Sequence, residues 1–262
     1  MIHGVLNIYK EQGFTSHDVV AKLRGILRQK KIGHTGTLDP AATGVLPVCL
    51  GKATKLCGML TDETKSYETV LLLGQTTDTQ DTTGTVLSSC PVQVTEEEVR
   101  EAVRSFTGEQ LQIPPMYSAL KVNGKKLYEL AREGKEIERK ARKVQFYRIE
   151  ILDLELPRVR MEVTCSKGTY IRTLCHDLGE KLGCGGCMER LERTRVGSFS
   201  REESITLSQV EALQKARELK AKITPIQDLF AGFPAVRALP EEDPYLNNGN
   251  PIYRDRTEEP EL

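Results

Sequence analysis

The sequence predicts a mixed α+β fold for this chain of 262 residues. Apolar runs of strand length alternate along it with segments in which apolar residues recur at helical spacing. Two patterns, Thr95–Glu98 and Thr206–Gln209, have the capping-box form that begins a helix. Hydrophobic residues make up 39% of the chain and charged residues 28%, which is ordinary for a folded domain with a buried core.

The first half of the chain is expected to alternate between strand and helix. The run GVLNIY at 4–9 predicts a strand, and Ser16 is expected to cap the helix that follows it. The runs VLPVCL at 45–50 and YETVLLLG at 67–74 predict two further strands, with a short helix near 54–60 between them. The capping box at Thr95 predicts a helix that ends near Phe106.

The second half repeats this alternation after a long connection. KVQFYRIEILDLEL at 143–156 and RMEVTC at 160–165 predict strands, and a last helix is expected from Thr206. Between them, TYIRTLCHDLGEKLG at 169–183 predicts a helix. Its inward-facing residues are expected to be Ile171, Leu174, Cys175, Leu178 and Leu182.

The net charge of zero hides an uneven distribution. Lys121–Arg148 holds ten Lys or Arg against four Glu, whereas Glu241–Leu262 holds seven acidic residues against two Arg. A basic segment beside an acidic tail favours contact with nucleic acid through one part of the surface.

The seven cysteines are odd in number and scattered, so reduced thiols in a cytoplasm are expected rather than a disulfide framework. The start of the chain lacks the pattern of a secretory leader, and no apolar run reaches the roughly 20 residues of a membrane helix. Cys184 and Cys187 have the spacing of half a zinc site. A second ligand pair at suitable spacing is missing, so a tight glycine turn between two helices is the favoured interpretation.

The stretch GHTGTLDPAATGVLP at 33–47 constrains one carboxylate, Asp39. Pro40 restricts the backbone of Asp39 to extended geometry, and the surrounding glycines permit close approaches. Arg172 near a helix start is disfavoured by the helix dipole, which suggests an acidic partner. From residue type alone, Tyr67 could be an ordinary strand aromatic and His34 a residue that stabilises the turn.

The long connection at 107–143 is the other candidate functional segment. Its Lys121, Lys125 and Lys126 alternate with Tyr117 and Tyr128, a mixture of charge and stacking planes typical of nucleic-acid surfaces. Charge alone leaves open whether the segment is functional or merely solvated.

Four segments together closely resemble the bacterial tRNA pseudouridine-55 synthase (TruB) family. They are GHTGTLDPAATGVLPVCLGKATK, KSYETVLLLGQTTDTQDTTG, IPPMYSALKVNGKKLYELAREG and CSKGTYIRTLCHDLGEKLG, in order within a similarity from about Val5 to Asp228. The resemblance implies a mainly antiparallel mixed sheet flanked by helices in a catalytic domain at 1–228, with a thumb-like RNA-binding insertion at about 107–143. The acidic tail at 229–262 resembles the start of an accessory RNA-binding module that is incomplete, and Glu11 replaces a proline that is frequent in the family.

The resemblance also implies a reaction: isomerisation of the T-loop uridine at tRNA position 55 to pseudouridine, with no cofactor and no metal. The base is expected to flip out of the RNA before it reacts. Asp39 is then the nucleophile, Arg172 holds its carboxylate, and Tyr67 stacks on the base near the proton that leaves C5. The other implied substrate-binding residues are His34 on the RNA, Tyr170 and Leu191 in the uridine pocket, Lys10 in a mainly structural position near the site, and Lys121, Lys125 and Lys126 on the thumb. Attack at the sugar C1′ and attack at the base C6 both remain open.

The implied partner is tRNA through its T-stem-loop, with no membrane contact and no obligate protein partner, so that the chain is a cytoplasmic monomer. Two other functions compete with this hypothesis. One is an RNA-binding or RNA-folding module without turnover, which the intact Asp39, Tyr67 and Arg172 disfavour. The other is an aspartate-nucleophile hydrolase, which would need a second acid or base near Asp39. Release of tritium from 5-tritiated uridine separates the three, because only the isomerase exchanges that hydrogen.

Overall fold

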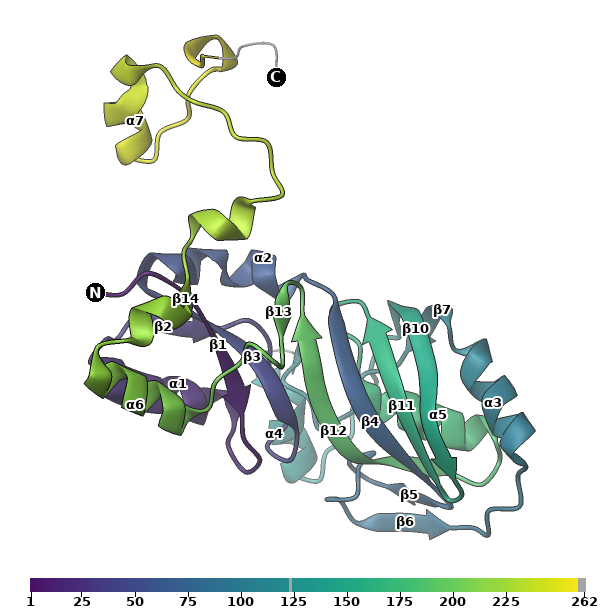
Figure 1. Cartoon of the computed structure of the whole chain (residues 1–262). Helices are drawn as coiled ribbons and strands as arrows, with labels where there is room; N and C mark the ends of the chain where they lie inside the picture. The colour runs from purple at the N-terminus through teal and green to yellow at the C-terminus, as the bar shows by residue number, and fades with distance from the viewer. Residues whose placement is uncertain (123, 259–262) are drawn as a thin grey trace. The chain divides into compact units, whose positions relative to one another are not determined.

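The structure of the chain, a computed structural model, describes residues 1–122 and 124–258 and divides into two units, Met1–Ile223 and Thr224–Leu262 (Figure 1). The first unit contains the helices α1 (Ser16–Leu27), α2 (Cys57–Thr61), α3 (Glu96–Ser105), α4 (Leu127–Arg132), α5 (Ile171–Lys181) and α6 (Leu207–Ala216), with 3₁₀ turns η1 (Gly51–Leu56) and η2 (Leu219–Lys222). Its longer strands are β1 (Gly4–Lys10), β3 (Thr43–Leu50), β4 (Lys65–Leu73), β7 (Gly108–Gln112), β10 (Arg142–Glu155), β11 (Arg158–Cys165) and β12 (Gly186–Val196).

A mixed, mainly antiparallel sheet of ten strands runs through this unit, as the sequence predicts. Its main path is β14-β1-β3-β12-β4-β11-β10-β7, in which the β3–β12 pair is parallel. The short strands are β2 (Ile32–His34) beside β3, β13 (Phe199–Ser200) beside β12 and β14 (Ile223–Thr224) at one edge. Two separate hairpins pair β5 (Gln75–Thr77) with β6 (Val86–Ser89) and β8 (Lys121–Val122) with β9 (Lys125–Lys126).

Two hydrophobic clusters hold helices against this sheet. One packs α3 and α5 onto β4, β10, β11 and β12, with Leu71, Phe146, Met161 and Leu174 almost fully buried. The other packs α1 and α6 onto β1, β2 and β3, with Leu6, Ile8, Leu23 and Leu46 at its centre (Figure 1). The first cluster also contains Leu38 and Ala42 of the β2–β3 loop and Ile171 at the start of α5, so this loop and the start of α5 share one core.

Two local expectations were wrong, and one long strand was not predicted. The N-cap of α1 is Thr15, whose side chain accepts from the Asp18 amide in a capping box, whereas Ser16 is the first helical residue. The Cys184–Cys187 turn joins helix α5 to strand β12, not two helices. β12 itself was not predicted, because charged residues, two of them buried, interrupt the apolar pattern that identifies a strand.

The second unit is short and held by its own contacts. It contains η3 (Gln227–Phe230), η4 (Pro240–Glu242), α7 (Asp243–Asn247) and η5 (Arg254–Arg256). Buried Glu242 forms an ion pair of 2.9 Å with Arg256. The domain boundary after residue 228 stays a prediction. Residues 259–262 of the predicted tail and Asn123 of the predicted insertion lie outside the described part of the chain. Across the described residues, no helix combines the length and the apolar character needed to span a membrane.

Candidate active site

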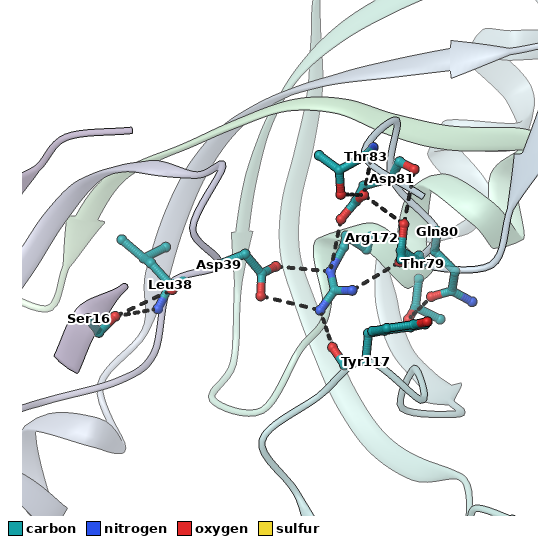
Figure 2. Close-up of polar contacts among 10 residues, drawn as sticks. Ser16, Leu38, Asp39, Thr79, Gln80, Asp81, Thr83, Tyr117 and Arg172 are labelled. Carbon is teal, nitrogen blue, oxygen red and sulfur yellow. Dashed lines mark hydrogen bonds and ion pairs between the residues drawn. The ribbon is translucent and has the colours of Figure 1, made fainter. Parts of the chain in front are cut away.

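The loop between β2 and β3 presents Asp39, and hydrogen bonds fix its backbone on both sides. The Ser16 hydroxyl accepts from the Leu38 amide at 2.9 Å and lies 3.4 Å from the Leu38 carbonyl (Figure 2). The Pro40 carbonyl accepts from the Gly13 amide at 2.9 Å. The start of α1 and the turn after β1 therefore fix the direction in which the Asp39 carboxylate points.

Lys10 stabilises this loop through hydrogen bonds to backbone carbonyl groups. Its side chain is fully buried, and Nζ donates to the carbonyls of Phe14, Glu11 and Pro40 at 2.7, 3.2 and 3.3 Å. Burial lowers its pKa to about 8, an effect that the nearby Asp39 partly opposes. These contacts stabilise the loop, and the role of Lys10 toward the substrate stays a prediction.

Arg172, in the first turn of α5, grips the Asp39 carboxylate with two nitrogen atoms. Nε lies 2.9 Å from Oδ2, and Nη2 lies 3.4 Å from Oδ1 (Figure 2). The guanidinium also donates to the carbonyls of Thr79 and Tyr117, at 2.9 and 2.7 Å. The Arg172 side chain is 5% exposed and that of Asp39 37%, so the carboxylate faces open space while its partner is enclosed.

A second carboxylate, Asp81, lies on the other side of Arg172. Its Oδ2 is 3.9 Å from Nε of Arg172, and its Oδ1 accepts from the hydroxyls of Thr79 and Thr83 and from the Thr83 amide (Figure 2). Arg172 is thus held between two carboxylates from different loops. Asp81 was not predicted from the sequence, although the threonines around it in DTQDTTG are typical of a loop built on a hydrogen-bonded aspartate.

Tyr67 on β4 forms the inner wall of the site. Its side chain is buried, and its register partner on β12 is Arg193. Burial raises the pKa of Tyr67 to about 12, and the Arg193 guanidinium beside it only partly offsets this rise. The phenol is therefore protonated at neutral pH, where it can stack on a base or donate a hydrogen bond but has no phenolate charge.

Tyr170 and Leu191 line the cavity of the site, and their contact with uridine stays a prediction. A cavity of about 320 Å³ opens above Asp39, and both residues line it together with Tyr67 and Arg172. The Gln112 side chain fixes the backbone of Tyr170: its Oε1 accepts from the Tyr170 amide at 2.8 Å, and its Nε2 donates to the Tyr170 carbonyl at 3.0 Å. Two residues of the lining that sequence reasoning missed are Lys65 and Arg193, both buried cations.

His34 lies outside this lining. It is on β2, where its ring makes an edge-to-face contact with His17 at a centroid distance of 5.2 Å. Burial, followed by the neighbouring His17, lowers the pKa of His34, so its imidazole is neutral at neutral pH. His34 therefore lies next to the Asp39 loop. Its contact with RNA stays a prediction.

Three lysines of the 107–143 segment that are predicted to bind RNA, Lys121, Lys125 and Lys126, lie on the β8–β9 hairpin and outside the cavity lining. Lys125 pairs with Glu133 at 3.4 Å, and Lys126 donates to the Tyr128 hydroxyl at 3.1 Å, a bond that raises the pKa of Lys126. Residues 118–120, just before the hairpin, do line the cavity. The segment therefore joins exposed cations to the wall of the site.

Comparisons with known proteins agree with one another. Residues 24–171 match the model of the TruB family pseudouridylate synthase (N terminal domain), and residues 172–231 match the tRNA pseudouridylate synthase B C-terminal domain. The tRNA pseudouridine synthase B of Lachnoclostridium phytofermentans is 55% identical over 97% of this chain and 85% of that protein. The protein of the same name from Alkaliphilus oremlandii is 53% identical over 83% of this chain and 73% of its own length.

Solved structures give the same picture of the fold. The crystal structure of a Cbf5-Nop10-Gar1 complex contains a chain that matches with a TM-score of 0.77 at 32% identity, covering 97% of this chain and 70% of the other. The archaeal box H/ACA sRNP Nop10-Cbf5 complex matches with a TM-score of 0.73 at 28% identity, covering 97% of this chain and 70% of the other.

Proposed function

The chain belongs to the TruB family of pseudouridylate synthases, and from this membership we infer that it is a tRNA pseudouridine synthase, an isomerase. We further propose that its substrate is the T-loop uridine at tRNA position 55. The observation that supports this proposal best is the pairing of an accessible Asp39 carboxylate with an enclosed Arg172 at 2.9 Å in the wall of a cavity of about 320 Å³. A uridine buried in a folded RNA could reach that carboxylate only after it flips out of its stack.

In this proposal Asp39 is the nucleophile, and the other groups prepare it. Arg172 keeps the carboxylate ionised and oriented, because a planar guanidinium can hold both oxygens at once. Tyr67, protonated and buried, offers its ring face to the flipped base. Tyr170 and Leu191 enclose that base, and His34 contacts the RNA beside the loop.

The test of this function is tritium release from a T-stem-loop transcript that carries 5-tritiated uridine. The proposal expects release at position 55 and none when that uridine is replaced by cytidine. An RNA-folding module or a hydrolase would release no tritium. We also propose that the protein acts as a monomer in the cytoplasm, which is consistent with seven cysteines that are all unpaired.

Asp81→Asn is expected to lower kcat about tenfold, roughly 1.4 kcal/mol in the barrier, with little change in KM. The amide keeps one oxygen for the threonine donors, so its NH2 group faces Nε of Arg172 and removes one of the two carboxylates that hold the guanidinium. Single-turnover and steady-state kinetics on a stem-loop substrate measure the effect.

Asp78→Asn is the matched control, because Asp78 lies in the same loop but is exposed, and among the described residues its side chain accepts only from the Thr85 amide. It should retain nearly full activity. Equal losses for both variants would show that the loop needs its overall charge and that Asp81 does not act through Arg172.

Neutralising Lys121, Lys125 and Lys126 together should weaken the binding of tRNA and of the isolated stem-loop alike. Each lost phosphate contact should remove about 0.7 to 0.9 from the slope of log K against log salt. Binding curves at several salt concentrations measure this slope. The control neutralises Lys215, Lys220 and Lys222, three exposed lysines on α6 and η2, so that both triple variants lose the same charge. An unchanged slope in the first variant, or equal changes in both, would remove the hairpin from RNA binding.

A further inference from the structure

The cavity beside Asp39 is lined by more cations than carboxylates. Four charged side chains line it: one carboxylate, Asp39, and three cations, Lys65, Arg172 and Arg193. Arg172 has two carboxylates within ion-pair distance, Asp39 and Asp81. In the described part of the chain, neither Lys65 nor Arg193 has a carboxylate within 4 Å.

Backbone carbonyl groups accept from both cations, and the Tyr67 phenol lies beside Arg193. Nζ of Lys65 donates to the carbonyls of Thr61 and Glu63 at 2.6 and 2.5 Å, and its side chain is buried. Arg193 donates from Nε to the Val45 carbonyl at 2.7 Å and is 1% exposed. Burying a cation without a counter-ion costs desolvation free energy. Both cations line the cavity, where an anionic ligand could act as the counter-ion.

The isomerisation moves a negative charge toward them. Attack at C1′ forms a bond between an Asp39 oxygen and C1′ and breaks the C1′–N1 bond, whose electron pair stays on N1 as a uracil anion. Attack at C6 forms an oxygen–C6 bond and shifts the C5–C6 π pair toward the C4 carbonyl as an enolate. Either route removes one negative charge from Asp39 and places it on the base.

We propose, on the basis of the isomerase function above, that Lys65 and Arg193 form an electropositive wall that stabilises the negative charge on the reacting base. The same wall makes this cavity a binding site for free anionic pyrimidine bases in preference to neutral ones. Neither residue has to touch Asp39 in this arrangement, because the charge that they stabilise is one that has left it.

The wall should weaken at high pH through Lys65. Burial lowers the pKa of Lys65 to about 8, and the groups that face its amine are Arg193 from β12, Cys165 from β11, and Asp62 and Glu63 from the turn before β4. Below about pH 8 the amine is charged and attracts an anion. Above it the charge is lost, so the affinity for an anionic base should fall as pH rises through this range.

The experiment compares two free ligands on the full chain by calorimetry: barbiturate, which is anionic at neutral pH, and uracil, which is neutral. Barbiturate should bind about tenfold tighter or more, the effect of one well-placed buried charge. Lys65→Met should remove most of this preference and leave the uracil affinity unchanged. Lys65→Arg should keep the preference and abolish its fall above about pH 8. Lys55→Met, at an exposed lysine of η1, is the control and should change nothing.

Equal affinities for the two ligands, or a preference that survives in Lys65→Met, would overturn the proposal. Inorganic phosphate serves as a third ligand: if it binds with the same dependence on Lys65 while barbiturate does not, the wall is a site for the RNA backbone and the proposal is wrong. Thermal unfolding confirms that each variant is folded, and Lys65→Arg keeps the test decisive if Lys65→Met is not. Calorimetry measures no turnover. Failure of this proposal can therefore be distinguished from failure of the isomerase function, which the tritium assay tests.

Discussion

Replacing Asp39 with asparagine is expected to abolish turnover, by about 10⁴-fold or more, as removal of a nucleophile does in other enzymes that act through one. The amide is nearly isosteric with the carboxylate and leaves the loop intact, because Ser16 and Lys10 hold the backbone of Leu38 and Pro40 rather than the Asp39 side chain. Its nitrogen and neutral oxygen are poor nucleophiles. Binding of tRNA should stay within a few-fold of wild type.

Two measurements check this prediction: tritium release in single turnover, and a filter-binding curve with unmodified tRNA. The binding curve is the internal control, because it shows that the variant is folded and still recognises RNA. A variant that retained about a tenth of wild-type activity would remove Asp39 from the role of nucleophile, since a group essential for bond formation cannot be replaced at so small a cost.

Loss of the Arg172 guanidinium is expected to have the next largest effect. In Arg172→Ala, two carboxylates and the carbonyls of Thr79 and Tyr117 lose a common, buried donor. Breaking one side of a buried pair typically costs about 3–5 kcal/mol, so both activity and stability should fall. The Tyr117 carbonyl lies just before the β8–β9 hairpin, so this variant should also loosen the segment that carries Lys121, Lys125 and Lys126.

Arg172→Lys separates charge from geometry. A lysine restores the positive charge, but its single ammonium cannot span both Asp39 oxygens and two carbonyls. We expect the melting temperature to recover in part, while kcat stays low. Kinetics and thermal unfolding on the same preparations measure both quantities. Full recovery of kcat by lysine would show that charge alone is sufficient and that the two-point grip has no role.

The sequence predicted most of the fold because its signals are local. The capping boxes at Thr95 and Thr206 begin helices as expected, and the alternating pattern of β4 buries every second residue. Ser16 shows the limit of such reasoning. Thr15 and Ser16 are both good caps by residue type, and the structure assigns the cap to Thr15 because Ser16 contacts Leu38, 22 residues away.

The site was predictable only in part, for a similar reason. Asp39, Tyr67 and Arg172 stand in distinctive motifs, and the structure brings them to one cavity. Asp81, Lys65 and Arg193 were missed because their importance arises from packing between elements. Arg193 is one of three arginines in β12, and only its register opposite Tyr67 buries it beside the site. Charge in a strand pattern normally indicates a solvated face, and nothing local distinguishes the exception.

The central claim is that this cavity isomerises a T-loop uridine through Asp39, and tritium release from a 5-tritiated T-stem-loop tests it most directly. Wild type should release the tritium of position 55 stoichiometrically, with no added metal or cofactor, whereas Asp39→Asn should release none while it still binds the RNA. Tritium release by Asp39→Asn at a rate close to that of wild type, or no release by wild type from an RNA that it binds, would contradict the account.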